Sequence, residues 1–284
     1  KENKAHPQID ARLKRAATAL FNLDRVIIFR TKRMFKMPYY KKIITSGSMV
    51  EVEVYKSIRR RNLKCIARGH KKAESTDKQK IRNTIQAQRN CQRLICNNFS
   101  AGDWYITLTL EQNQSEEDAR KTMHNFLRRL AYFCRKAPQL PELKYIGCLE
   151  KGKKGKRWHG HLVIPRLPVE IIQKIWKKGA GTGRIQFEQL YAAGNYKKLA
   201  DYIRKDVTGK KRMKQSRNLI PPKVEVKEAG SRDIARFMKG KPPVAPRGYR
   251  IIEDECEMYV NDITGTSFRM VYVRRCDTCR KSRW

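Results

Sequence analysis

The chain has 284 residues, of which 40% are hydrophobic, so it is long enough to form one large domain or two small ones with a true core. Lysine and arginine number 65 against 27 acidic residues, which gives a net charge of +38. Such a protein repels itself unless it binds a polyanion. Nucleic acid is the expected partner, because the basic residues are spread along the whole chain and are not gathered on one amphipathic, membrane-binding helix.

The sequence gives no sign of a membrane or export segment. There is no run of about 18 apolar residues, and no charged-then-apolar leader follows Lys1. We therefore expect a cytoplasmic protein with no membrane partner, in which the eight cysteines are reduced thiols. Cys276 and Cys279 form a single CxxC pair, which is weak evidence for zinc because no second pair lies near.

The first hundred residues predict a basic segment of mixed structure. Residues 1–24 are expected to form a helix or a basic arm, and residues 25–56 to form strands, with SGS at 46–48 separating two extended runs. Residues 73–97 have the apolar spacing of a helix. The apolar positions of that helix are Ile81, Ile85, Leu94 and Ile95.

The middle of the chain shows a regular order of elements. The patterns predict, in turn, a strand at 106–110, a helix at 115–136, strands at 143–150 and 157–165, a helix at 169–179, a strand at 183–190 and a helix at 195–207. The first six elements match the split βαβ, or ferredoxin-like, pattern, which gives an antiparallel sheet with helices packed on it. The helix at 115–136 has an apolar face made by Met123, Phe126, Leu127, Leu130 and Phe133.

These elements predict an α+β protein with a central ferredoxin-like (RRM-like) antiparallel sheet flanked by helices. We assign the sheet domain to residues 99–228, a basic N-terminal extension to residues 1–98, and a C-terminal extension to residues 229–284. The C-terminal extension contains a β-hairpin at 257–273, where two alternating runs flank a DITG turn.

Two of the five histidines, His159 and His161, lie one residue apart in the strand RWHGHLVIP. Residues at i and i+2 of a strand point to the same face. Glu150 ends the preceding strand, so it can lie opposite the histidines if the two strands pair as a hairpin. Two imidazoles and a carboxylate suit manganese or magnesium, and zinc also fits, with positions left open for a substrate oxygen.

A second candidate group lies in ADYIRKD. Tyr202 and Lys205 are three residues apart in the predicted helix and therefore share a face. One interpretation is a tyrosine packed on the core beside a solvated lysine. The other is a nucleophile: a phenol attacking phosphorus would form a 5′-phosphotyrosyl bond, helped by a metal ion and a nearby cation that stabilise the developing charge.

Three motifs in this order resemble those of the HUH endonucleases, and among them the rolling-circle replication initiators, or Rep proteins, of bacterial plasmids and phages. The resemblance covers roughly residues 90–225 and is carried by YITLTL (105–110), WHGHLVI (158–164) and DYIRKD (201–206), with NNFSAGDW before and SRNLIPPKV after them. Gly160 departs from the pattern, which has a bulky residue between the two histidines. We expect the glycine to leave the ligands intact and to weaken strand packing.

The resemblance implies roles for particular residues. Glu150, His159 and His161 are implied to be metal ligands, and Tyr202 the nucleophile. Lys205 is implied to orient the phosphate or the metal site, and we expect Asp206 to steady that lysine. The tyrosine follows the histidine motif, as in Rep proteins and single-tyrosine transposases and unlike conjugative relaxases.

The sequence also separates this protein from two-tyrosine initiators. Those place a second tyrosine four residues from the first, and position 198 is Lys. Tyr196 lies off the Tyr202 face and is the weaker candidate nucleophile. Trp158 is the best candidate for stacking on a base of single-stranded DNA, with a core aromatic as the alternative role; Trp104 and Trp176 are further candidates.

The interpretation at this point is a metal-dependent nickase and strand-transferase that initiates rolling-circle replication on single-stranded DNA and an origin hairpin or duplex. The sequence has no Walker phosphate loop, so we expect a host helicase, as well as a host polymerase, to act with it in a bacterial cytoplasm. The alternatives are a non-enzymatic nucleic-acid-binding or regulatory protein and a single-tyrosine HUH transposase. The sequence leaves the oligomeric state open.

Overall fold

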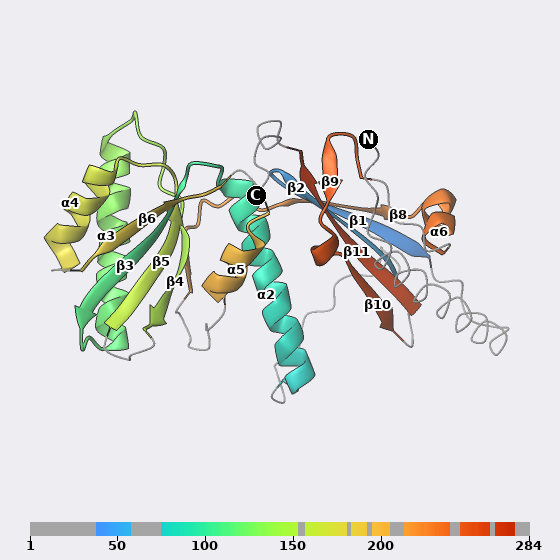
Figure 1. Ribbon diagram of the computed structural model, residues 1–284, viewed down its shortest axis with the longest axis horizontal. Coiled ribbons are helices and arrows are strands. Elements are labelled where there is room, and N and C mark those ends of the chain that lie inside the picture. The colour runs from blue at the N-terminus through green and yellow to red at the C-terminus, as the bar shows by residue number, and fades with distance from the viewer. Residues whose placement is uncertain are drawn as a thin grey trace, which may run out of the picture. The chain divides into compact units, whose positions relative to one another are not determined.

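The computed structural model describes residues 38–57, 75–152, 157–180, 183–191, 195–204, 213–238, 245–261 and 265–275 (Figure 1). These residues form two units. The first contains the described residues before 46, those from 50 to 57, and those from 223 to 275. The second contains residues 46–49 and the described residues from 75 to 222.

The second unit is built on a five-stranded antiparallel sheet with strand order β6-β3-β5-β4-β7. Its strands are β3 (Trp104–Gln112), β4 (Ile146–Lys151), β5 (Arg157–Ile164), β6 (Ile185–Gln189) and β7 (Met213–Gln215). β5 lies between β3 and β4 and is antiparallel to both, so β3 and β4 run in the same direction. This is the split βαβ arrangement, and it confirms the predicted ferredoxin-like α+β fold.

Helices cover both faces of this sheet. α3 (Glu116–Lys136) and α4 (Val169–Ala180) lie on one side, while α5 (Lys197–Arg204) and α2 (Asp77–Asn98) lie on the other (Figure 1). Two of these helices begin at capping residues: the Thr76 side chain accepts from the Gln79 N–H, and the Ser115 side chain accepts from the Asp118 N–H. The four helices agree with the predicted ones within a few residues at each end.

The hydrophobic core of this unit lies between the sheet and the pair α3 and α4. Alternate residues of β3 and β5 point into it, together with one face of α3. The α3 face differs from the prediction at its end, because Phe133 is 36% exposed whereas Cys134 is 5% exposed. The buried stripe steps four residues from Leu130 to Cys134, which leaves Phe133 at its edge.

The prediction for α2 was right in type and wrong in its buried face. Ile81 is 61% exposed and Ile85 is 41% exposed, so neither belongs to a core. Burial begins only at Cys91 and includes Ile95, in the C-terminal half, which packs against α5. The apolar spacing thus identified a helix whose first half has no apolar partner among the described residues.

The first unit contains a six-stranded antiparallel sheet, in which β9 pairs with β11 outside the main order β10-β11-β2-β1-β8. Its strands are β1 (Tyr39–Ser46), β2 (Met49–Lys56), β8 (Lys223–Glu228), β9 (Tyr249–Ile251), β10 (Glu257–Asn261) and β11 (Gly265–Arg274). A helix, α6 (Ser231–Met238), follows β8, and the 3-10 turn η1 (Glu253–Glu255) follows β9. The strands β7, β8 and β9 and the helix α6 were not predicted.

This sheet joins segments that the sequence analysis treats as separate extensions. The predicted N-terminal strands are β1 and β2, and the predicted hairpin at 257–273 is β10 with β11. β11 pairs beside β2, so both segments lie in one sheet. The domain boundaries after residues 98 and 228 stay predictions. The predictions for residues 1–37 and for the pair Cys276 and Cys279 lie outside the described residues.

Within the described ranges, no helix is both long and apolar enough to cross a membrane. The described cysteines are free thiols, as expected for a reducing compartment, and all but one of them are buried. They are Cys91, Cys96, Cys134, Cys148 and Cys256.

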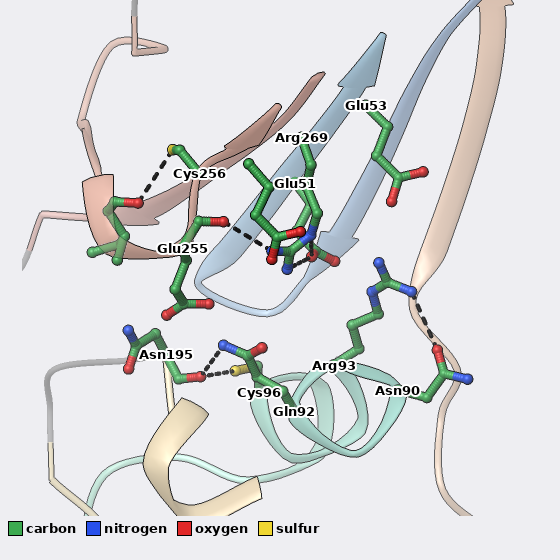
Figure 2. Close-up of polar contacts among 12 residues, drawn as sticks. Glu51, Glu53, Asn90, Gln92, Arg93, Cys96, Asn195, Glu255, Cys256 and Arg269 are labelled. Carbon is green, nitrogen blue, oxygen red and sulfur yellow. Dashed lines mark hydrogen bonds and ion pairs between the residues drawn. The ribbon is translucent and has the colours of Figure 1, made fainter. Parts of the chain in front are cut away.

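A buried ion pair lies in the sheet of the first unit. Arg269 on β11 is 3% exposed and Glu51 on β2 is 0% exposed. The Arg269 Nε donates to Glu51 Oε1 at 2.9 Å, and its Nη1 donates to the backbone oxygen of Glu255 at 2.9 Å (Figure 2). Both charges are out of water, so each depends on the other for compensation.

Replacing Arg269 with alanine is expected to lower the free energy of unfolding by about 3–5 kcal/mol, because the buried Glu51 carboxylate then loses this guanidinium. The double variant Arg269→Met/Glu51→Leu should lose clearly less. Urea titration followed by far-UV circular dichroism measures both. The control is Lys42→Ala, which breaks the half-exposed Lys42–Glu53 pair (3.2 Å) and should cost under about 1 kcal/mol. Equal losses in Arg269→Ala and Lys42→Ala would contradict the analysis.

Candidate active site

The two faces of the five-stranded sheet carry different chemistry. On β5, Trp158, Leu162 and Ile164 point into the core, so His159 and His161 point to the opposite face. The same alternation on β3 places Tyr105, Thr107 and Thr109 on the histidine side. We call this side the histidine face; its residues are Tyr105, Thr107, Thr109, Cys148, Glu150, His159 and His161.

The strand register brings Glu150 to the histidines. β4 and β5 pair antiparallel, with Glu150 directly opposite His159 and Cys148 directly opposite His161. On the other side of β5, Thr109 is opposite His159 and Thr107 is opposite His161. The hairpin expected between the two strands is therefore present.

The Tyr202 hydroxyl meets Glu150 and His161 on the histidine face. Tyr202 is on α5, 52 residues after Glu150, and its hydroxyl donates to Glu150 Oε2 at 3.0 Å. The same hydroxyl oxygen lies 3.3 Å from His161 Nε2. Glu150 Oε2 and His161 Nε2 are 3.2 Å apart, so the three atoms form a nearly equilateral triangle. The phenol is 42% exposed, which leaves it open to a substrate.

Hydroxyl groups of β3 hold the other nitrogen of each imidazole. The Tyr105 hydroxyl lies 2.9 Å and the Thr107 hydroxyl 3.2 Å from His161 Nδ1. The Thr109 hydroxyl lies 3.4 Å from His159 Nδ1. Such contacts fix the ring orientation and direct the Nε2 of His161 toward Tyr202 and Glu150. The sequence analysis missed these three residues, although the alternation of YITLTL and the register with WHGHLVI would have placed them beside the histidines.

Burial governs the charge of His161, which is 5% exposed. Desolvation lowers the pKa of its imidazole below the ordinary value; the nearby Glu150 carboxylate raises this pKa by less, and His159 lowers it further. The ring is therefore neutral at physiological pH. A neutral imidazole can offer a lone pair to a metal ion or accept a hydrogen bond.

The fit of a metal ion is good for two of the three predicted ligands. Ligand atoms about 2.1 Å from one cation are separated by about 3 Å, and the 3.2 Å between Glu150 Oε2 and His161 Nε2 agrees with this. The third, His159, has its ring centroid 6.4 Å from that of His161. Within the described part of the chain, no group of three His, Cys, Asp or Glu side chains is arranged to hold a metal ion. His159 would need a side-chain rotation to join the other two.

Gly152 leaves room for His159 at the end of β4. A Cβ atom at position 152 would lie 3.0 Å from His159 Nε2 and 3.2 Å from the Arg157 oxygen. Gly160 has a different surrounding, since a Cβ there would make ordinary contacts of 3.5 Å with Met123 Sδ and 3.6 Å with Leu108 Cβ. The glycine between the histidines thus faces the core, where α3 and β3 fill the space that a bulky residue would take.

The aromatic residues considered for base stacking are core residues or nearly so. Trp158 is 4% exposed, and its Nε1 donates to the Gln114 oxygen at 3.1 Å. It points away from His159, so it has the core role considered as the alternative, and its ring is closed to a base. Trp176 is 1% exposed and donates to the Gly183 oxygen. Trp104 is partly buried, with its Nε1 bonded to the Leu167 oxygen.

Tyr196 differs from Tyr202 in its surroundings. It is 3% exposed, and its hydroxyl donates to the Tyr191 oxygen at 3.1 Å. Burial raises the pKa of this phenol to about 12, which opposes formation of a phenolate. Lys205 and Asp206 lie outside the described residues, so their predicted positions beside Tyr202 stay predictions.

α2 supports the helix that carries Tyr202. Asn195 precedes α5, and its backbone oxygen accepts from Gln92 Nε2 at 2.8 Å and from Cys96 Sγ at 3.4 Å (Figure 2). Ala200 and Ile203 of α5 are buried. Tyr202 therefore points to the sheet from a helix fixed on its opposite side.

Comparison with protein families gives one match for this region. The model of a replication-associated protein family, that of the ORF2 protein and its relatives, matches residues 103–207. The matched segment contains every element from β3 to α5 together with Glu150, His159, His161 and Tyr202. The match supports a replication-associated, Rep-like role for the chain. Comparison with curated proteins finds no match, and comparison with solved structures finds none either.

In the metal-free protein, the His161 imidazole is expected to titrate below pH 6.5 because burial disfavours its charged form. The unfolded chain then binds a proton that the folded chain refuses. The contribution of His161 to stability is thus fully present above pH 6.5 and is lost as the pH falls below it. NMR of the imidazole protons measures the midpoint. Glu150→Gln should lower it further, and a midpoint at or above 6.5 would contradict this account.

Proposed function

We propose that this protein is a metal-dependent DNA nickase and strand-transferase that uses Tyr202 as its nucleophile to initiate rolling-circle replication of a plasmid or phage. The observation that carries the proposal is the meeting of the Tyr202 hydroxyl with Glu150 Oε2 at 3.0 Å and His161 Nε2 at 3.3 Å. A tyrosine in an ordinary surface position has no reason to meet a carboxylate and a neutral imidazole from two other elements. The family match and the net charge of +38 support DNA as the substrate.

The proposed reaction exchanges one phosphoester for another. The Tyr202 oxygen attacks the phosphorus of a phosphodiester in single-stranded DNA, forming the Oη–P bond while the bond from phosphorus to the 3′ oxygen breaks. The phenol gives up its proton, and the 3′ oxygen takes one. The products are a 5′-phosphotyrosyl enzyme and a free 3′-hydroxyl, which primes synthesis. Attack by a 3′-hydroxyl on the phosphotyrosyl bond reverses the step and rejoins a strand without ATP.

The residues around Tyr202 suit this reaction. A free phenol has a pKa near about 10 and is a weak nucleophile at neutral pH. Glu150 already accepts its hydrogen bond and can receive the proton. Because α5 is fixed by α2 and the sheet, the phenol is held in place before the substrate arrives. Lys205 is proposed to orient the phosphate, and Asp206 to steady Lys205.

Glu150, His159 and His161 would hold the divalent cation, and Tyr105, Thr107 and Thr109 would orient the two imidazoles. The donor set suits Mn²⁺ or Mg²⁺ and also accommodates Zn²⁺. When bound, the ion supplies positive charge that stabilises the charge developing on the scissile phosphate.

The proposed partners follow from the reaction. The enzyme would act on single-stranded DNA at an origin hairpin or duplex, with a host helicase opening the template and a host polymerase extending the 3′-hydroxyl. The match to a replication-associated family model favours this role over that of a single-tyrosine transposase. A purely binding protein would need the positive charge but not the contact among Tyr202, Glu150 and His161.

Tyr202→Phe should abolish the covalent protein–DNA adduct, because it removes the attacking oxygen and little else. The protein is incubated with Mn²⁺ and single-stranded oligonucleotides that tile the DNA flanking its coding region, and adducts are resolved on a denaturing gel. Tyr196→Phe is the matched control: it removes the other candidate phenol and should keep the adduct. An adduct formed by Tyr202→Phe would rule out this nucleophile, and no adduct with any strand would favour the binding protein.

His161→Ala and His159→Ala should each abolish cleavage while leaving salt-sensitive DNA binding nearly intact, because the histidines are proposed to hold a cation and the phosphate contacts lie elsewhere. Electron paramagnetic resonance of free Mn²⁺ measures metal binding directly; each variant should bind Mn²⁺ about tenfold or more weakly. Fluorescence anisotropy at several salt concentrations measures DNA binding. Loss of DNA binding equal to the loss of cleavage would contradict a purely catalytic role for the histidines.

A further inference from the structure

The N-terminal half of α2 is exposed on every side. Each residue from Thr76 to Gln86 is exposed, over three turns of helix, and burial begins only at Cys91. Most helices are stabilised by packing an apolar stripe. This half of α2 has none in contact with the described residues, so its persistence as a helix needs another explanation and its exposure needs a purpose.

Local interactions hold this half together. The Thr76 side chain caps its first turn, and Lys80 Nζ lies 3.1 Å from Asp77 Oδ1. Gln79 donates to Asn83 at 2.8 Å, and Gln86 donates to Asn90 at 2.9 Å, both across one turn. The buried Arg93 donates to Asn90 at 3.2 Å and so ties the last of these amides to the packed half (Figure 2). These contacts stabilise the half-helix from within.

The amides form a continuous line along the helix. At about 100° per residue, positions i, i+4, i+7 and i+11 fall on one face. We call this line the amide stripe; it consists of Gln79, Asn83, Gln86 and Asn90. The same rotation places Arg82 and Arg89 along one edge of the stripe. Glutamine and asparagine amides pair with adenine in the DNA major groove, and arginine pairs with guanine or with phosphate.

The charge of this half-helix also suits DNA. Its basic residues are Lys78, Lys80, Arg82 and Arg89, and its one acidic residue, Asp77, is already paired with Lys80. The side chains are long and the helix is narrow, so positive charge surrounds a core of hydrogen-bonding amides. A protein partner would require a buried apolar centre, which this stripe lacks.

We propose that the N-terminal half of α2 docks in the major groove of duplex DNA and reads base edges through the amide stripe. This inference rests on the proposed function in taking origin DNA as the ligand, and it adds a recognition surface that is separate from the Tyr202 site. A helix about 10–12 Å wide fits the B-DNA major groove, which is about 12 Å wide. The half-helix from Asp77 to Asn90 is about 20 Å long, enough to follow several base pairs. Double-stranded RNA is a poor ligand, because its major groove is narrow and deep.

The structure links this surface to the reaction. The C-terminal half of the same helix holds α5 through Gln92 and Cys96, which contact Asn195, and α5 carries Tyr202. Asn98 further fixes this end by exchanging two hydrogen bonds with the Ile220 backbone, at 2.8 and 2.9 Å. The register in which α2 sits on the duplex would therefore set which phosphate of the adjoining single strand can reach the phenol.

The test is selection of bound sequences from a pool of random-sequence duplex DNA by the full chain. The stripe variant is Gln79→Ala/Asn83→Ala. The matched control is Thr84→Ala/Gln88→Ala on the opposite face of the same half-helix. Both double variants replace polar residues with alanine, the strongest helix former, so both should keep the helix. Circular dichroism checks this.

Wild type and control should enrich the same motif. The stripe variant should lose about tenfold or more of the preference for that motif over random duplex, while its affinity for random duplex changes less than about threefold. Arg82→Gln/Arg89→Gln should weaken binding to all duplexes and reduce the slope of log K against log salt by about two. No enriched motif with wild type, or unchanged preference in the stripe variant, would overturn the proposal.

Two further measurements separate competing results. Sedimentation of the free proteins tests a second copy as the occupant; a dimer that the stripe variant dissociates, with motif preference unchanged, would overturn the DNA proposal. Tyr202→Phe should select the same motif as wild type, and the stripe variant should still form the adduct on a short single strand. Failure of the adduct with α2-dependent selection intact would refute the nickase and leave duplex recognition standing.

Discussion

The antiparallel pairing of β5 between β3 and β4 is the constraint on which the candidate site depends. It sets Glu150 opposite His159 on one side and Thr109 opposite the same histidine on the other. A shift of one residue in either register would turn these side chains to the core face, because side chains alternate along a strand. The core packing of Trp158, Leu162 and Ile164 against the helices resists such a shift, so the hydrophobic face of β5 fixes the geometry of the polar one.

The phenol reaches the site through a second, independent support. α5 is short, and a helix of its length is unstable alone in water. Its burial against α2 and the hydrogen bonds to the Asn195 backbone supply the missing stability. Tyr202 can then remain 42% exposed and still have a defined position, because the residues beside it, not the tyrosine itself, are packed. Order and accessibility, which usually oppose each other, are assigned to different residues of one helix.

Periodicity predicted most elements of the second unit, and the spacing of Glu150, His159 and Tyr202 predicted which residues meet. The same reasoning could not rank side chains within a face: Phe133 has the right spacing but lies at the edge of the buried stripe. It also could not give the strand register that brings Thr109 to His159, since register depends on contacts between distant segments. β8 was missed because its alternating KVEVKE has little hydrophobic signal, and its partner β1 lies far away in the sequence.

The sheet of the first unit has a consequence for synthesis on the ribosome. Glu51 is made 218 residues before the arginine that compensates its charge, and β1 waits for β8 in the same way. Every strand of the five-stranded sheet is translated in between. The later domain in the sequence therefore completes its fold first, while the earliest strands remain open edges that need protection from wrong pairing until the last hairpin emerges.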